Sequence, residues 1–196
     1  MPLKNSFTRN DFIDAAFKIV RTKGWDKLTA RSLAKELNCS TMPIYSYLKS
    51  MKFLYEELRK KAVDLQMTYQ KKPRTGQIFF DMGVGYILFA KQERNLFRFL
   101  HHKKEGEARF PEIEKRIRET ALRNLTQNMK ADPNLEGLDG RALKDVLTKM
   151  WIFVHGLAFL VNNHAFADDE KKVLETIKET GKLLIAGKKS TNKKLN

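Results

Sequence analysis

Residues 28–50 constrain the fold more than any other stretch, because two short helical patterns lie only a few residues apart. Thr29 can cap the first helix, since its hydroxyl can accept a hydrogen bond from an unpaired backbone N–H of the first turn. An apolar stripe follows at helical spacing, formed by Leu33, Ala34 and Leu37. Asn38 comes next, and asparagine tolerates the left-handed conformation in which many helices end. The stretch is therefore predicted to begin as a capped amphipathic helix that ends in a tight turn.

The second helical pattern has an apolar inner side and a polar outer side. Ser40 is a suitable N-cap, and Ile44 and Leu48 face inward. The outward residues are Thr41, Met42, Pro43, Ser46 and Tyr47. Such a face suits a helix in the DNA major groove, where each base pair presents different donors, acceptors and methyl groups. We therefore predict a helix-turn-helix that reads DNA, although exposure or packing explains Met42 at least as well as a base contact does.

At this point the sequence resembles the TetR-type bacterial transcriptional repressors. The resemblance covers residues 8–54, and its signature is a helix, Gly24-Trp25, Leu28-Thr29, and the segment Ile44-Tyr45-Ser46-Tyr47-Leu48-Lys49. Two departures stand out: Asn38 stands where the family usually has Gly, and Met51 where it usually has Lys. The second departure puts one phosphate contact in doubt, which Lys49 or Lys52 is placed to replace.

The resemblance also implies which side chains contact DNA. Phosphate contacts are implied for Tyr45 and Lys49, and base-reading or groove-lining positions for Thr41, Pro43, Ser46 and Tyr47. In the first helix of the pair, the resemblance implies contacts with the DNA backbone or a groove edge for Thr29, Ala30 and Arg31. Phosphate contacts would position the head, and base contacts would choose the sequence. Simple solvation is the alternative interpretation for the charges of Arg31 and Lys49.

The charge of the chain favours an anionic partner without locating its site. The 196 residues carry a net charge of +15, and the pI is near 9.9. Residues 1–60 hold twelve Lys and Arg against six Asp and Glu, a net of +6, which leaves +9 for the remainder. Basicity therefore supports nucleic-acid binding but does not single out the helix-turn-helix.

Cysteine content and hydropathy indicate a cytoplasmic protein. Cys39 is the single cysteine, which excludes an intramolecular disulfide and fits a reducing compartment. The N-terminal residues lack the apolar core of a signal peptide, and no run approaches the roughly 18 apolar residues of a membrane span. With five prolines, ten glycines and apolar residues spaced by three and four, the sequence predicts an all-α fold.

We expect about nine helices in two functional parts and a tail. Residues 1–50 form a three-helix DNA-binding head, residues 51–187 a helical body for ligand binding and dimerisation, and residues 188–196 a disordered basic tail. The last two long helices are expected at about 141–164 and 168–186. The family arrangement implies that these two helices from each of two subunits form a four-helix dimer interface.

Aromatic residues of the body are the candidates for an effector cavity. Most are expected to be plain core, but a set on facing helices could line an apolar pocket with a few polar anchors. The set is Phe79, Met82, Tyr86, Phe89, Phe97, Leu100, Trp151, His155 and Phe159. Asp81 and His155 are possible anchors, although a hydrogen-bonded structural role is the better interpretation for each of them.

Neither a cofactor nor a metal is expected. His101 and His102, with Glu105 and Glu107 nearby, lack the defined ligand spacing of a zinc site. The sequence contains neither a glycine-rich phosphate-binding motif nor a recognisable nucleophile motif, which argues against an enzyme. The prediction is a homodimeric, ligand-released repressor that binds a near-palindromic operator. A basic architectural DNA-binding protein without an effector is the alternative.

Overall fold

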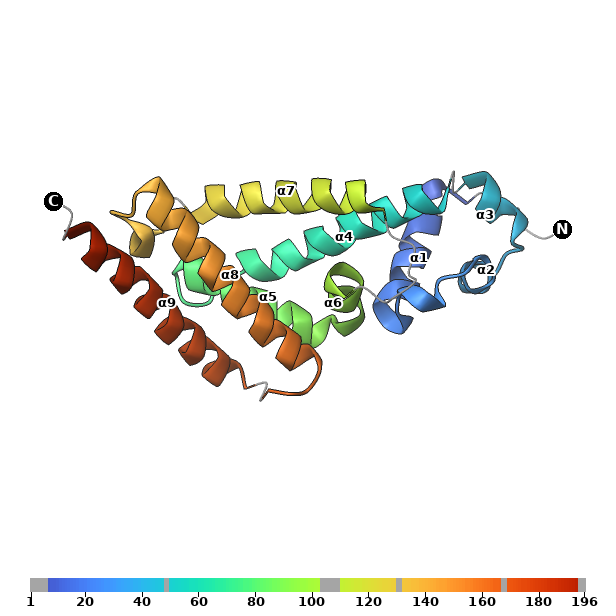
Figure 1. Ribbon diagram of the computed structural model, residues 1–196. Coiled ribbons are helices and arrows are strands. Elements are labelled where there is room, and N and C mark those ends of the chain that lie inside the picture. Colours follow the sequence, from blue (N-terminus) through green and yellow to red (C-terminus); the bar gives the residue numbers. More distant parts are fainter. Residues whose placement is uncertain (1–6, 48–49, 103–109, 130–131, 167–168, 194–196) are drawn as a thin grey trace. The chain divides into compact units, whose positions relative to one another are not determined.

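The computed structural model describes residues 7–47, 50–102, 110–129, 132–166 and 169–193 (Figure 1). The described residues form nine α-helices and two short 3-10 helices, and they contain no β-strand. The predicted all-α class is confirmed.

The helices pack in two compact units. The first contains Met1–Asp64 and Glu93–Ile117, and the second contains Leu65–Gln92 and Arg118–Asn196. Helices α4 (Met51–Lys71) and α7 (Pro111–Met129) contribute residues to both. This division differs from the boundary expected at residue 50, because α6 (Arg94–His101) packs on α1 (Arg9–Lys23) in the first unit. The boundary at residue 50 stays a prediction about which part contacts DNA.

Capping boxes start two helices of the first unit. The hydroxyl of Thr8 accepts a hydrogen bond from the backbone N–H of Asp11, whose carboxylate accepts one from the N–H of Thr8. Thr29 and Ser32 form the same arrangement at the start of α2 (Ala30–Leu37), as 3.0 and 2.8 Å hydrogen bonds. Gly24 ends α1 with a φ of 94°, a conformation that favours glycine. A 3-10 helix, Trp25–Lys27, follows it.

The turn between α2 and α3 has the predicted conformation, but the second helix starts later than expected. Asn38 ends α2 in the left-handed region, with φ 51° and ψ 46°. Helix α3 spans Met42–Tyr47. Its first described turn is closed by the N–H of Ile44, which donates to the carbonyl of Thr41 at 3.2 Å. The residue at the capping position is therefore Thr41, and Ser40, the expected N-cap, lies one residue before it.

A buried arginine joins three helices of the first unit. Arg59 on α4 is 5% exposed. Its guanidinium donates to the carbonyls of Phe99 and Leu100, at 2.9 and 2.8 Å, and to the carboxylate of Glu114 on α7. The hydroxyl of Tyr55 donates to the same carboxylate. Arg59 thus satisfies carbonyls at the C-terminus of α6 that lack partners within the helix.

Helix α5 (Ile78–Gln92) is the central element of the second unit. It is buried along most of its length and packs against α8 (Gly140–Asn162) and α9 (Glu170–Lys193), which also contact each other (Figure 1). A Cβ atom added at Gly85 would lie 2.2 Å from the carbonyl oxygen of Tyr69. Only glycine lets the backbone of α5 approach the end of α4 this closely.

Two buried carboxylates hold the loops around α5. Asp81 accepts hydrogen bonds from the N–H of Arg74 at 3.1 Å, and from the N–H and hydroxyl of Thr75 at 2.8 and 2.6 Å. Asp132 precedes the 3-10 helix Pro133–Leu135 and accepts from the N–H of Phe79 at 2.6 Å. The carboxylate of Asp81 is therefore used structurally, in agreement with the preferred interpretation of this residue.

The C-terminal helix is longer than expected. Helix α9 continues to Lys193, so the first residues of the predicted disordered tail are helical, and residues 194–196 lie outside the described part. Leu183, an apolar residue of this helix, is 75% exposed. Helical continuation is reasonable there because lysine is a good helix former and residues 188–193 contain neither proline nor glycine.

Candidate nucleic-acid interface and body cavity

Helix α3 exposes the side that the sequence predicted. Ile44 is 4% exposed and anchors the helix, while Thr41 and Ser46 are exposed. Met42 is 78% exposed and Tyr47 37%. The ring of Tyr47 also stacks on that of Phe12 in α1, with centroids 4.9 Å apart, so Tyr47 supports the head as well as lining its surface. The side chains of Pro43 and Tyr45, and the whole of Lys49, lie outside the described part of the chain.

The first helix of the pair offers two exposed cations, Arg31 and Lys35, and its capped N-terminus. Arg31 is exposed in the first turn of α2, and Ala30 is half-buried. Thr29 is exposed, but its hydroxyl already accepts the hydrogen bond of the cap. A contact from Thr29 to a DNA backbone would therefore share that oxygen, whereas Arg31 can extend to a phosphate without breaking a cap.

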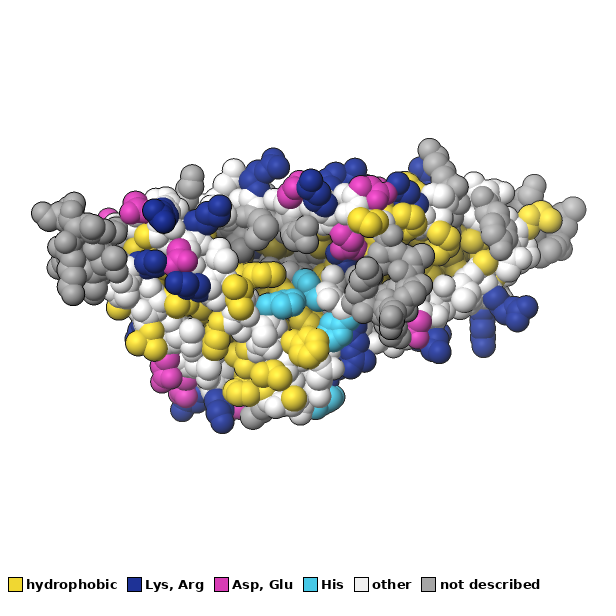
Figure 2. All heavy atoms as spheres, in the orientation of Figure 1, with side chains coloured by type: hydrophobic (Ala, Val, Ile, Leu, Met, Phe, Trp, Pro, Cys, Tyr) yellow, Lys and Arg dark blue, Asp and Glu magenta, His cyan; other side chains and the backbone are white. Residues whose placement is uncertain are grey.

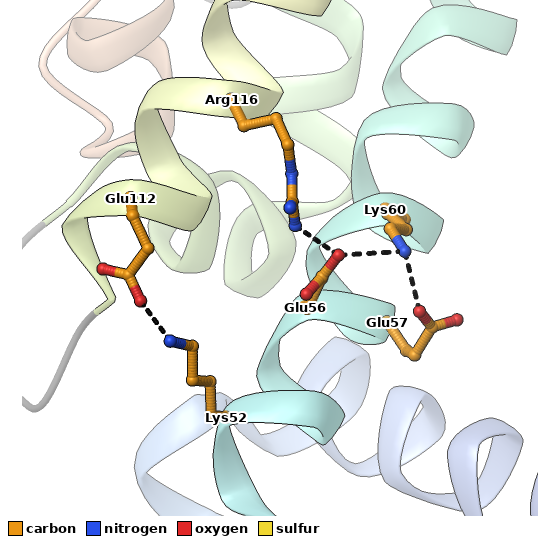
Figure 3. Close-up of polar contacts among 6 residues, drawn as sticks. All are labelled: Lys52, Glu56, Glu57, Lys60, Glu112 and Arg116. Atoms are coloured by element: carbon orange, nitrogen blue, oxygen red, sulfur yellow. Dashed lines mark hydrogen bonds and ion pairs between the residues drawn. The ribbon is translucent and has the colours of Figure 1, made fainter.

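Lys52 has a carboxylate partner that no sequence pattern predicted. Its Nζ lies 2.5 Å from Glu112 in the first turn of α7, and hydrogen bonding to Lys52 lowers the pKa of Glu112 (Figure 3). One turn further along α4, Glu56 pairs with Arg116 and with Lys60. The Lys52 pair is about half exposed on both sides, and exposed ion pairs contribute little to stability. A phosphate could therefore replace Glu112 as the partner of Lys52.

An apolar cavity lies within the second unit, bordered by α4, α5, α7 and α8. Its open space is about 50 Å³, which is room for a few water molecules and well below the roughly 300–1,000 Å³ of typical ligand pockets. The lining residues are Gln70, Phe79, Met82, Gly83, Tyr86, Met129, Leu147, Met150, Trp151 and Val154. Three methionines border the space, and methionine is the apolar side chain that rearranges most easily.

A tyrosine and a histidine form the polar contact beside this cavity. The hydroxyl of Tyr86 and Nδ1 of His155 are 2.8 Å apart. The rings of His155 and Trp151 stack, with centroids 5.4 Å apart. Burial raises the pKa of Tyr86 and lowers the pKa of His155. Both side chains are therefore neutral at pH 7, and the pair suits an uncharged polar group better than an ion.

The predicted cavity set is brought together only in part. Phe79, Met82, Tyr86 and Trp151 line the cavity. Phe97 and Leu100 instead lie on α6 in the first unit, where both are buried. Phe89 is fully buried and its ring packs against Tyr69, whereas Phe159 is 46% exposed. The helical spacing identified apolar positions, but it could not tell which of the two units each helix joins.

The histidine pair shows no metal cluster within the described residues. No group of three or more His, Cys, Asp or Glu side chains that could hold a metal occurs there. Glu105 and Glu107, which were considered with His101 and His102, lie outside those residues.

Helix α8 has an exposed apolar side. Among the described helices it alone is long and apolar enough to cross a membrane by length and composition, with a mean hydropathy of 1.2. One side packs on α5 and α9, and the other exposes Trp151, Ile152, Phe159 and Leu160. Figure 2 shows hydrophobic side chains gathered over this helix. Core helices of globular proteins pass the same test, and here the buried side includes Asn162, which donates to the carbonyl of Ala90 at 2.8 Å.

Comparison with known proteins identifies the fold. No protein-family model and no curated protein matches the chain. Among solved structures, a TetR-like transcriptional regulator from Rhodococcus sp. RHA1 aligns with 91% of this chain and 96% of its own, at 12% identity and a TM-score of 0.63. A TetR-family regulator from Rhodococcus sp. aligns over 90% and 98%, at 14% identity and a TM-score of 0.62. One from Mesorhizobium loti MAFF303099 aligns over 91% and 95%, at 13% identity and 0.58.

The chain has the TetR-type fold. The resemblance that residues 8–54 carried is thus confirmed at the level of the backbone and extends over nine tenths of the chain. At these identities the likeness concerns the fold alone, and the function has to be argued from the side chains of this protein.

Two features of this TetR-type chain escaped the sequence analysis. The Lys52–Glu112 pair joins residues 60 positions apart, and the carbonyls that Arg59 binds lie 40 and 41 positions away. A charged residue at an inward position of α4 was the available signal for Arg59, because a buried charge requires partners. Nothing local to Lys52 pointed to Glu112.

Proposed function

We propose that the protein is a homodimeric, sequence-specific DNA-binding transcriptional regulator located in the cytoplasm. It acts as a repressor that a small apolar or amphipathic effector releases from a near-palindromic operator. The observation that carries the proposal is the exposed face of α3 in a TetR-type fold. The second helix of such a pair lies in the major groove and reaches base edges with its N-terminal residues.

The DNA-contacting residues fall into two groups. Those assigned to phosphates, the backbone or a groove edge are Thr29, Ala30, Arg31, Tyr45, Lys49 and Lys52. Those assigned to bases or groove lining are Thr41, Pro43, Ser46 and Tyr47. Exposure of Arg31, Thr41 and Ser46 supports the assignment. Lys52 is paired with Glu112, so it would contact a phosphate only after it leaves this carboxylate.

The dimer is proposed to form through α8 and α9. Trp151, Ile152, Phe159 and Leu160 on α8, with Leu183 on α9, leave large apolar side chains exposed. Large exposed apolar surface marks an interaction site in soluble proteins. Two identical faces would cover each other around a two-fold axis, which a near-palindromic operator matches.

The effector site is proposed at the cavity in the second unit. Because the open space is about 50 Å³, a larger molecule must displace side chains such as Met82, Met129 and Met150. The neutral Tyr86–His155 pair would then be the polar anchor. Displacement gives the effector unequal affinity for two body conformations, which is the requirement for regulation.

DNA binding is tested with the upstream region of the gene against a shuffled duplex, by fluorescence anisotropy at about 50 and 200 mM salt. Preference that survives the higher salt supports a specific regulator.

Lys49→Ala is expected to weaken binding to all sequences and to flatten the salt dependence by about one unit of slope. Ser46→Ala is the matched variant, expected to change sequence preference more than affinity.

The net charge of +15 favours one alternative, a basic architectural DNA-binding protein. Such a protein would bind both duplexes alike, would lose affinity for both as salt rises, and would show no effector. Selection from random-sequence DNA separates the two, because only a specific regulator enriches a consensus.

A further inference from the structure

We propose that α3 selects its operator through the methyl groups of thymine, with Met42 as the side chain that contacts them, and makes no charge-assisted hydrogen bonds to guanine. This inference rests on the DNA-binding function proposed above and names the base chemistry by which the helix reads DNA.

The composition of the reading segment limits what it can recognise. Residues 40–47 are Ser-Thr-Met-Pro-Ile-Tyr-Ser-Tyr, without Arg, Lys, Asn, Gln, Asp or Glu. Guanine is typically read by a bidentate Arg or Lys, adenine by Asn or Gln, and cytosine by Asp or Glu. None of these pairings is open to α3. Its hydroxyls can hydrogen-bond to more than one base, so apolar contact with the thymine methyl is the most selective interaction left to α3.

Met42 is the apolar side chain placed for that contact. It is the first residue of α3 and, at 78%, the most exposed of the large apolar side chains in the described residues. A single exposed apolar residue is ordinary on a protein surface. The position of Met42 is what favours a base contact, because the first turn of a DNA-reading helix is the part that reaches base edges. The flexible, polarizable thioether can follow the surface of a methyl group.

Charged contacts to phosphates are left to neighbouring elements, so α3 needs no charge of its own. Arg31 and Lys35 are exposed on α2, and Lys27 is exposed just before it. These cations supply sequence-independent attraction. Affinity and selectivity therefore come from different helices, and removing the apolar contact should change selectivity while the salt dependence stays the same.

The test replaces thymine by deoxyuridine, one position at a time, in an operator obtained by selection from random DNA. Uracil lacks only the C5 methyl, and its hydrogen-bonding groups are those of thymine. The loss expected for each contacted methyl is about fourfold in Kd, from the typical free energy of burying one carbon group. Replacing guanines by 7-deazaguanine, which lacks the N7 acceptor, should leave Kd within about twofold, a smaller change than the loss of a charge-assisted hydrogen bond to N7 would cause.

Two methionine variants identify the side chain responsible. Met42→Ala should bind thymine and deoxyuridine operators equally, whereas Met51→Ala should keep the full difference. Met51 is an exposed methionine of the same unit, at 54%, but it is the first residue of α4 and not of α3. Met51→Ala therefore makes the same substitution at an exposed position outside the reading helix. Circular dichroism checks that both variants are folded, as expected for exposed positions.

The outcomes separate this inference from the function on which it rests. A selected operator that binds equally with thymine and deoxyuridine overturns the methyl contact and leaves the regulator intact. A thymine preference that Met42→Ala retains removes Met42 from the interface. A selection that enriches no sequence overturns both proposals.

Discussion

At the scale of single residues, buried polar groups and one glycine hold loops and helices of the second unit in place. Asp81 is 5% exposed, yet its carboxylate accepts hydrogen bonds from Arg74 and Thr75. Burial by itself raises the pKa of Asp81, but these hydrogen bonds outweigh it, and the pKa lies below its usual value. The charged form therefore stabilises the loop that joins α4 to α5.

Replacing Asp81 by Asn should lower the free energy of unfolding at pH 7 by about 2 kcal/mol, the usual worth of hydrogen bonds to a charged group. Because the folded pKa is depressed, this stability is present above the unfolded pKa of about 3.9 and is lost as the pH falls through the folded value. The difference between variant and parent should shrink below about pH 4. Urea unfolding at pH 7, 5 and 3.5 measures it.

The control for that change is Asp145→Asn, which removes a carboxylate that is 34% exposed and paired with Lys149 and Lys188. Its effect at pH 7 should be smaller than that of Asp81→Asn. Equal effects would show that Asp81 has no special role in the loop.

Gly85→Ala should destabilise the second unit by about 1–3 kcal/mol or more, the cost of forcing extra atoms into a packed interior. The added Cβ would lie 2.2 Å from the carbonyl oxygen of Tyr69 and 2.6 Å from the Cα of Gln70, so backbone must move. Gly140→Ala is the control, because a Cβ atom added at Gly140 would meet no atom within 4 Å. Thermal unfolding of the two variants should differ clearly, and equal midpoints would contradict the close approach of α4 and α5.

At the scale of helices, local signals predicted boundaries well and long-range partners poorly. Thr29 and Asn38 were assigned correctly because a cap depends on residues three or four positions away. Trp151 lines the cavity as predicted, but Phe159 is 46% exposed, because helical spacing reports an apolar side and not what covers it. The same limit applies to Phe97 and Leu100, whose helix joins the first unit through contacts with α1.

The ion pair between α4 and α7 yields a prediction for DNA binding. Glu112→Gln removes the partner of Lys52, so that Lys52 can contact a phosphate without competition. Binding should become tighter at low salt, and the salt dependence should steepen by up to about one unit of slope. Anisotropy titrations across the salt range measure both.

Glu57→Gln is the matched control for charge. It makes the same change in net charge and frees a hydrogen bond of Lys60, which keeps its 3.1 Å contact with Glu56 (Figure 3). If both variants steepen the salt dependence equally, the effect is one of overall charge and Lys52 is not a DNA contact.

At the scale of the whole molecule, the exposed side of α8 predicts how the chain associates. Ile152 is 58% exposed on that side, and Ile152→Asp would place a charge in the proposed interface, where burial without a partner is costly. The dissociation constant of the dimer should rise at least about 100-fold, from a cost of some 3 kcal/mol. Sedimentation over a range of concentrations measures it.

Ile78→Asp is the matched control. Ile78 is 38% exposed at the first residue of α5, and the same substitution there should leave association unchanged. If Ile152→Asp also leaves the dimer intact, the interface lies on another face.

The uncovered side of α8 has a consequence for gene dosage. In the proposed dimer, two protomers must associate before the protein can bind both half-sites of an operator. While most of the protein is monomeric, the fraction of operator occupied is then proportional to the square of the free protomer concentration. Halving the amount of protein then reduces the occupied fraction by about fourfold at low occupancy, as mass action requires. The apolar side chains of α8 would thus turn a gradual change in protein level into a threshold, independently of any effector.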